Sequence, residues 1–154
     1  MADYFLDNSA LVKRHVNEVG SLWIRSLTRP KAAHTLYIAR ITAVEVYSAI
    51  TRRQRGRHLS STQAGAILGH FRRHLAQRYN VLEMTPALFT EAMLAARKHG
   101  LRAYDAVQLT VALEVDRLNQ KANFGPVTLL SSDRDLNIAA TAEGLAVDDP
   151  ITHP

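Results

Sequence analysis

The chain of 154 residues contains no cysteine, which excludes disulfide bonds, thiol nucleophiles and thiolate zinc sites. It also lacks the apolar runs of a transmembrane helix or of a signal peptide, so a cytoplasmic protein without membrane contact is expected. The Gly-x-x-x-x-Gly-Lys and Gly-x-Gly-x-x-Gly phosphate loops and the His-Glu-x-x-His zinc motif are absent as well. These absences exclude several common classes of enzyme.

Acidic residues are missing from one long internal segment. The chain as a whole carries 19 Lys and Arg against 14 Asp and Glu, a formal charge of +5, but residues 46–82 contain no acid. A basic surface favours an anionic partner such as RNA, although an acidic protein segment or simple solubility would also account for it. This acid-free segment contains seven arginines: Arg52, Arg53, Arg55, Arg57, Arg72, Arg73 and Arg78.

Strand-like and helix-like segments alternate along the chain. Each β-prone run is short and apolar, and most are followed by a stretch with apolar residues at helical spacing. Such alternation predicts one domain over residues 1–154, a three-layer α/β/α fold with a mainly parallel central sheet. The predicted strands are 3–7, 35–40, 80–84, 127–130 and 145–147, and the predicted helices begin at Asn8-Ser9, Thr42, Ser60, Pro86, Leu101 and Asp133.

Four acids occupy the junctions between these predicted elements. Because ligands bind beyond the carboxyl ends of the strands in such sheets, side chains from several junctions can meet in one pocket. Each acid also has a structural explanation: Thr42 and Glu45 fit a capping box, Asp133 fits an N-cap, Asp105 suits a first helical turn, and Asp7 could simply end a strand. Their conjunction instead predicts a metal site formed by Asp7, Glu45, Asp105 and Asp133.

A cluster of carboxylates is suited to hard cations. Mg²⁺, or Mn²⁺ in its place, binds oxygen ligands, polarises a phosphate and activates a water for in-line attack. The hydroxyls of Ser9, Thr42 and Ser132 are candidates for orienting the acids or bound waters. Other candidates near the site are Asp135, which could share an ion or water, and Arg102 and Arg134, which could contact the scissile phosphate.

Four segments of the chain resemble the acidic motifs of PIN-domain nucleases. They are Tyr4-Phe5-Leu6-Asp7-Asn8-Ser9-Ala10, Thr42 to Glu45, Leu101-Arg102-Ala103-Tyr104-Asp105-Ala106-Val107-Gln108-Leu109, and Leu129-Leu130-Ser131-Ser132-Asp133-Arg134-Asp135-Leu136. The third motif is the most specific and the second the least. The resemblance extends from Tyr4 to about Val147, and length and motif order are similar to those of VapC-type toxins.

This resemblance implies a Mg²⁺-dependent endoribonuclease, an RNA substrate, a homodimer, and inhibition by a small antitoxin protein that covers the active site. It assigns metal binding to Asp7, Glu45, Asp105 and Asp133. Two other functions remain open: a PIN-domain nuclease that processes RNA or DNA without a toxin role, and a basic nucleic-acid-binding module without catalysis. His70 and His74, four residues apart, could share a metal, but the surrounding arginines favour a solvated or nucleic-acid-facing surface.

Overall fold

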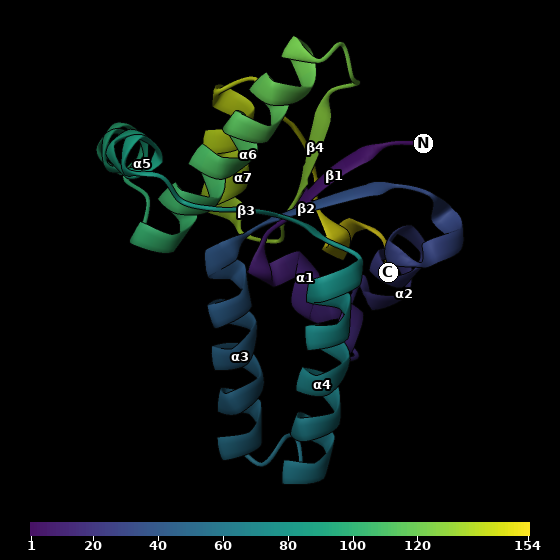
Figure 1. The fold of residues 1–154 in the computed structure, drawn as a ribbon. Coiled ribbons are helices and arrows are strands. Elements are labelled where there is room, and N and C mark those ends of the chain that lie inside the picture. The colour runs from purple at the N-terminus through teal and green to yellow at the C-terminus, as the bar shows by residue number, and fades with distance from the viewer.

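The structure, a computed structural model, describes residues 1–154 and has a central sheet of five parallel strands (Figure 1). Their order in the sheet is β3-β2-β1-β4-β5. All four neighbouring pairs are parallel, which confirms the predicted mainly parallel sheet. The strands are β1 (Asp3–Leu6), β2 (Thr35–Ala39), β3 (Asn80–Leu82), β4 (Val127–Leu130) and β5 (Ala146–Asp148).

Helices cover both faces of this sheet, so the predicted three-layer α/β/α architecture is confirmed. Residues of the first four helices join the core on one face, and residues of α6 and α7 join the core on the other. The helices are α1 (Asn8–His15), α2 (Ser21–Thr28), α3 (Arg40–Arg55), α4 (Ser61–Gln77), α5 (Pro86–His99), α6 (Ala103–Lys121) and α7 (Arg134–Ala142), with 3-10 turns at Pro30–Ala32 and Pro150–Thr152.

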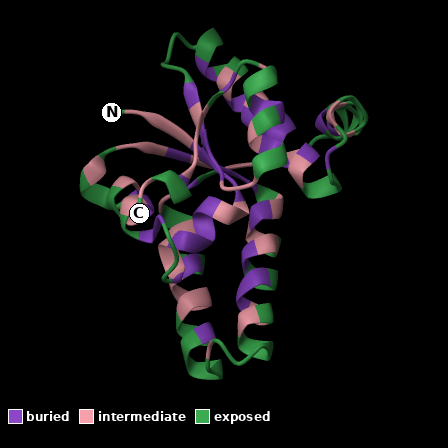
Figure 2. Ribbon diagram, turned by 180° about the vertical axis from the view of Figure 1, so that it is seen from behind, coloured by how far each residue is buried: buried purple, intermediate pink, exposed green.

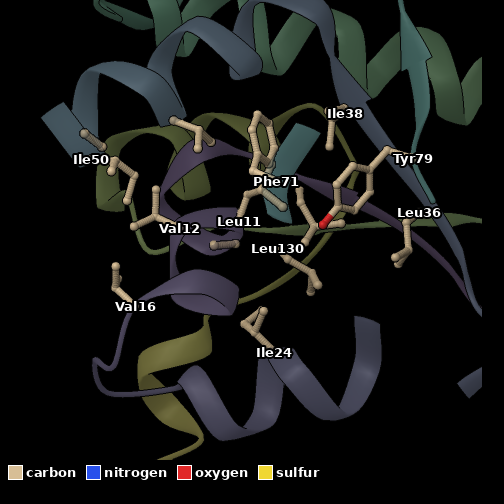
Figure 3. Packing of buried hydrophobic residues seen from close by; sticks show 14 of the residues in the cluster. Leu11, Val12, Val16, Ile24, Leu36, Ile38, Ile50, Phe71, Tyr79 and Leu130 are labelled. Carbon is tan, nitrogen blue, oxygen red and sulfur yellow. The ribbon is translucent and has the colours of Figure 1, made fainter. Parts of the chain in front are cut away.

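The strand side chains alternate between two hydrophobic cores. In β1, Leu6 belongs to the core under α1, α3 and α4, whereas Phe5 belongs to the core under α6 and α7. Alternation follows from the period of two in a strand, and both faces are apolar because helices cover both. Figure 3 shows the first core, where Phe71 of α4 lies among side chains of α1, α3 and the sheet.

The order of the strands creates a switch point in the middle of the sheet. The chain proceeds outward from β1 to β2 and β3, then returns through α5 and α6 to place β4 on the opposite side of β1. The carboxyl ends of β1 and β4 are in register at Leu6 and Leu130. Ligands bind at such switch points in open α/β sheets, so the residues after these two strands are of particular interest.

Most predicted elements are present within a few residues of their expected ends, but three local expectations were wrong. The cap of α1 is Asp7, whose side chain accepts a hydrogen bond from the Ala10 amide, and not Asn8 or Ser9. Helix α3 begins at Arg40 after Ala39, which makes no side-chain cap, so Thr42 and Glu45 form no capping box. Helix α6 begins at Ala103 rather than Leu101.

The C-terminal turn is anchored on α2, a helix that the sequence had not indicated. Gly20 at its start has a positive φ of 85°, and a Cβ there would lie 2.2 Å from the carbonyl oxygen of Pro150. The rings of Trp23 and His153 stack with their centroids 3.9 Å apart. Glycine is therefore required at this position both for backbone conformation and for space.

No helix of the structure is long and apolar enough to cross a membrane.

Candidate active site

Asp7 lies at the carboxyl end of β1 and is almost completely buried. Its Oδ1 accepts hydrogen bonds from the Ser9 hydroxyl at 2.7 Å and the Ala10 amide at 2.9 Å. Its Oδ2 accepts a third, from the Ser131 hydroxyl at 2.8 Å. These bonds fix the carboxylate in one orientation across the β1–β4 junction.

The residues after β4 complete the same junction. The Ser132 amide donates to the Ser9 hydroxyl at 2.8 Å, and the Asp133 amide donates to the Ser131 hydroxyl at 3.0 Å. Asp133 itself caps α7, since its Oδ1 accepts a hydrogen bond from the Leu136 amide at 3.0 Å. Asp133 thus caps α7 through Oδ1, as expected, and the cap does not use its Oδ2.

Glu45 lies in the second turn of α3 and is held by a residue of α6. The Gln108 side chain is buried, and its Nε2 donates to Glu45 Oε1 at 2.6 Å and to the Thr42 hydroxyl at 2.8 Å. Thr42 and Glu45 are three residues apart and share one face of α3. A single amide group therefore ties the second motif to the third.

Asp105 lies in the first turn of α6, where Arg102 bridges it to Asp133. The guanidinium is 3.6 Å from Asp105 Oδ2 and 3.7 Å from Asp133 Oδ2. Its side chain is 82% exposed, so these contacts are screened by water and are weak. Arg102 thus places a positive charge between these two carboxylates.

Burial and neighbouring carboxylates raise the pKa of three of the four acids. Burial raises the pKa of Asp7 to about 6, partly opposed by its three hydrogen bonds, and the charge of Asp133 raises it further. Burial also raises the pKa of Glu45 to about 7, with Asp7 and Asp105 adding to the effect. For Asp105, burial and then Asp133 raise the pKa, while Arg102 lowers it. Like charges held together in this way favour the binding of a cation.

The donor chemistry of this cluster suits Mg²⁺ or Mn²⁺, because all four side chains supply hard carboxylate oxygens. No three His, Asp or Glu side chains are arranged so that they could hold one metal ion together. Mg²⁺ does not require such a cage, since it usually keeps several waters and is bound through one or two carboxylates and substrate phosphates. The cluster therefore fits this ion by ligand type and charge.

The remaining sequence candidates lie around the cluster in different ways. The Ser132 hydroxyl is buried without a partner, and it is the neighbouring Ser131 that contacts Asp7. Asp135 and Arg134 are both located on α7, and Asp135 is close enough to raise the pKa of Asp105. Arg134 forms part of the wall of a shallow surface pocket further along this helix.

Ser131 and Gln108 are site residues that the sequence reasoning missed. Gln108 follows Asp105 by three positions, so helical spacing alone would have placed it on the same face of α6. Ser131 precedes Asp133 by two positions, a spacing typical of a serine hydroxyl that accepts a hydrogen bond from a backbone amide. These spacings are visible in the sequence, but the acid that each side chain contacts is not, because Ser131 reaches Asp7 and Gln108 reaches Glu45 across distant elements.

The acid-free segment forms α4, β3 and most of α3, and two of its seven arginines serve the fold. Arg53 pairs with Glu18, and Arg78 donates to the carbonyl oxygen of Thr28 at 3.4 Å. The other five are exposed on the α3–α4 hairpin, which projects from the sheet in Figures 1 and 2: Arg52, Arg55, Arg57, Arg72 and Arg73. Only these five of the seven arginines therefore contribute to the exposed basic surface.

His70 and His74 meet a third histidine, His15 of α1. The ring centroids lie 4.2 Å apart for His70 and His74 and 5.4 Å apart for His15 and His70. Arg14 donates to His74 Nδ1 at 3.0 Å, which occupies that nitrogen. The three rings do not form a metal site, and they pack the α1–α4 contact instead.

The four acidic motifs and the parallel sheet are features of one known family. Residues 4–144 match the family described as PIN domain. The chain belongs to the PIN domain family. None of the curated proteins compared with the chain matches its sequence.

Solved structures resemble this PIN domain over almost its whole length. PAE2754 from Pyrobaculum aerophilum has a TM-score of 0.63 at 23% identity, covering 98% of this chain and 91% of its own. Mycobacterium tuberculosis VapC20, a sarcin–ricin loop cleaving toxin, also has a TM-score of 0.63, at 16% identity, covering 98% and 99%. VapBC2 from Rickettsia felis, bound to a DNA fragment from its promoter, has a TM-score of 0.60 at 13% identity, covering 96% and 98%. At these identities, the likeness concerns the fold.

Proposed function

We propose that this PIN domain is a Mg²⁺-dependent endoribonuclease that acts in the cytoplasm as the toxin of a toxin–antitoxin pair. The observation that carries the proposal is the group of four carboxylates, which come from four separate elements and are joined at the switch point of the sheet by the contacts of Ser131, Gln108 and Arg102. The similar structures of a VapC toxin and a VapBC pair support the toxin role.

In this proposal, Asp7, Glu45, Asp105 and Asp133 hold one or two divalent ions. Bound Mg²⁺ would polarise the scissile phosphate and activate a water for in-line attack. Ser9 and Ser131 keep the Asp7 carboxylate oriented through their hydroxyls. Gln108 does the same for Glu45.

Arg102, which lies between Asp105 and Asp133, would also contact the substrate. Its side chain is exposed and only weakly held by the two carboxylates, so with an ion bound there its guanidinium would be free to contact the RNA phosphate. Arg134 and Asp135 directly follow Asp133 in the first turn of α7, and they would contact the substrate or a bound water.

Cleavage of single-stranded RNA by the purified protein tests the nuclease. EDTA should abolish cleavage, Mg²⁺ or Mn²⁺ should restore it, and Ca²⁺ should support little because its coordination is larger and less rigid. Asp→Asn at Asp7, Asp105 or Asp133, and Glu45→Gln, should each reduce the rate by orders of magnitude, whereas the exposed control Glu91→Gln should not. Full activity after exhaustive chelation, or in all four variants, would contradict the proposal.

The toxin role has its own test. Expression of the protein in a bacterial host should arrest growth, and the Asp105→Asn variant should not. Harmless expression of a protein that cleaves RNA in vitro would instead favour a processing nuclease.

The partners proposed with this role are a cognate antitoxin and a second copy of the chain. A short reading frame immediately upstream of the gene is the expected source of the antitoxin. Co-expression of its product should inhibit cleavage, and light scattering should give the mass of a homodimer. A monomer that no upstream product inhibits would count against both partners.

A further inference from the structure

A narrow slot lies directly beside Glu45 on the surface of the protein. Its volume is about 170 Å³, below the roughly 300–1,000 Å³ of pockets that hold drug-sized ligands. It can therefore hold only part of a larger ligand. Three segments meet there, and the slot is lined by Asn8, Val44, Glu45, Ser48, Arg52 and Tyr104.

Two exposed apolar side chains form walls of this slot. Tyr104 is 53% exposed and Val44 is 59% exposed, although both are large and apolar enough to be buried. Each immediately precedes one of the acids, Asp105 and Glu45 respectively. Exposed aromatic rings in a nucleic-acid site stack on unpaired bases, and this mode is available in single strands but not in a paired duplex.

Arg52 provides a positive charge at the far end of the slot. It follows Glu45 by seven residues on the same face of α3, about 10 Å along the helix axis. Its side chain is exposed and makes no ion pair or hydrogen bond, whereas the adjacent Arg53 is paired with Glu18. At that distance its guanidinium would hold a flanking phosphate and not the scissile one.

Asn8 adds an unsatisfied polar group to the wall. Its Oδ1 is shielded from solvent and has no hydrogen-bond partner in the protein. A base in the slot would meet the other end of this amide, since Nδ2 is not shielded and makes no hydrogen bond in the protein. An amide nitrogen can donate to the edge of a base.

From these features we infer that the slot is a nucleotide subsite that binds one unpaired base of single-stranded RNA beside the scissile phosphate. The base lies between the Tyr104 ring and Val44, the Asn8 amide contacts its edge, and Arg52 holds the next phosphate. This inference rests on the proposed endoribonuclease function, and it assigns the choice of cleavage position to these residues.

RNA binding by the metal-free protein in EDTA tests the subsite without cleavage. The probes are short single-stranded homopolymers of A, C, G and U, and the control is a blunt-ended RNA duplex with no unpaired base. Tyr104→Ala should weaken binding of the single strands roughly tenfold, as expected for loss of one stacked base, while Tyr104→Phe should keep it. Phe124→Ala is the matched control, because Phe124 is also an exposed aromatic but lies beyond the opposite end of α6.

The two polar residues should change binding in different ways. Arg52→Ala should weaken all single strands equally and reduce the slope of log affinity against log salt by about 0.7, whereas the exposed Arg97→Ala should not. Asn8→Ala should change the ranking of the four homopolymers and shift the positions of cleavage when Mg²⁺ is supplied. Thermal melting of each variant would reveal any loss of folding.

The outcomes separate this inference from the proposed function. If the parent protein cleaves RNA and Tyr104→Ala, Arg52→Ala and Asn8→Ala all bind and cleave like the parent, the subsite is wrong and the nuclease stands. If the parent neither binds nor cleaves RNA, both are wrong. Equal losses for single strands and the blunt-ended duplex would also overturn the subsite, since an unpaired base would then play no part.

Discussion

Asp7 combines almost complete burial with three hydrogen bonds that favour its charged form. Burial has the larger effect, since the pKa rises to about 6 from the ordinary value of 3.8. Above pH 6 Asp7 is therefore ionised in the folded protein, although its ionisation costs more free energy there than in the unfolded chain. The buried charge of Asp7 therefore lowers the stability of the metal-free protein at neutral pH.

Asp7→Asn should therefore stabilise the metal-free protein, and the gain should depend on pH. It should be near zero below about pH 3, where Asp7 is protonated in both states, and should reach about 3 kcal/mol above pH 6. Urea unfolding in EDTA between pH 3 and pH 8 would measure it. Glu91→Gln, an exposed control, should give a curve parallel to the parent, and a parallel curve for Asp7→Asn would contradict the expectation.

Gln108→Leu should impair metal activation while leaving the acids in place. Loss of the 2.6 Å hydrogen bond removes the interaction that lowers the pKa of Glu45, so more of this carboxyl is protonated at pH 7. The Mg²⁺ concentration for half-maximal cleavage should rise about tenfold at pH 7, and less at pH 9. Thr42→Val, which removes only the other partner of Gln108, should have a smaller effect. A shift independent of pH would point to general disorder of the site.

The sequence predicts the acids of the candidate site better than their partners. An acid at the end of a strand or the start of a helix is visible from local pattern alone, and the topology brings such positions to one edge of the sheet. Which hydroxyl or amide contacts each acid depends on side-chain rotation and on the packing of distant elements. Ser131 rather than Ser132 reaches Asp7 for this reason, and Gln108 of α6 reaches across to α3.

At the scale of elements, the α3–α4 hairpin carries most of the exposed basic charge near the site. Five arginines remain solvent-exposed there after Arg53 and Arg78 are used by the fold. Helix α4 packs Phe71 inward and presents Arg72 and Arg73 outward. The hairpin is therefore a candidate to bind RNA phosphates beyond the slot, or an acidic segment of an antitoxin.

Arg72→Ala combined with Arg73→Ala should weaken RNA binding for all sequences alike. The slope of log affinity against log salt should fall by about 1.4, or about 0.7 for each phosphate that the variant no longer neutralises. Arg29→Ala with Arg97→Ala is the control, since both of those side chains are exposed outside the hairpin. If the double variant keeps RNA affinity and loses antitoxin affinity instead, the surface serves the inhibitor. If neither the RNA affinity nor the antitoxin affinity changes, the charge of this surface serves only solubility.

Elements with a clear local pattern could be predicted from the sequence, including short strands, whereas α2 could not. Helix α4 has both an apolar stripe and a Ser60–Gln63 capping box, so its predicted start at Ser60 was almost correct. Helix α2 has only eight residues, and it follows Gly20, which is required by the contact with the C-terminal turn. The order of the strands could not be predicted from local sequence pattern either, because it depends on the side of β1 on which β4 pairs.

At the scale of the whole molecule, resistance to acid should depend on the histidines between α1 and α4. Burial lowers the pKa of His15 to about 3, and the nearby His70, Arg14, His74 and Arg25 lower it further. Burial also lowers the pKa of His74, to about 4. A folded-state pKa below the unfolded value of about 6.5 means that stability falls as the pH drops below 6.5.

His15→Phe should make the protein less sensitive to acid. Phenylalanine keeps the edge contact with Phe71 and removes a group that only the unfolded chain can protonate readily. Between pH 7 and pH 4.5 the variant should lose about 2 kcal/mol less stability than the parent. Denaturant unfolding at the two pH values would measure it, with the exposed His58→Gln as control. Equal losses in parent and variant would show that the carboxylates control acid stability.

The position of β1 at the centre of the sheet has a consequence for synthesis. Asp7 is translated early, but its partner Ser131 and the last acid, Asp133, follow it by more than 120 positions. At about 5–20 residues per second, that interval lasts roughly 6–25 s on the ribosome. A nascent chain can pair β1 with β2, and β2 with β3, during this time, yet it lacks β4 and the complete set of acids. The ribosome that makes this protein is thus not exposed to the assembled group of four acids until Asp133 has been added to the chain.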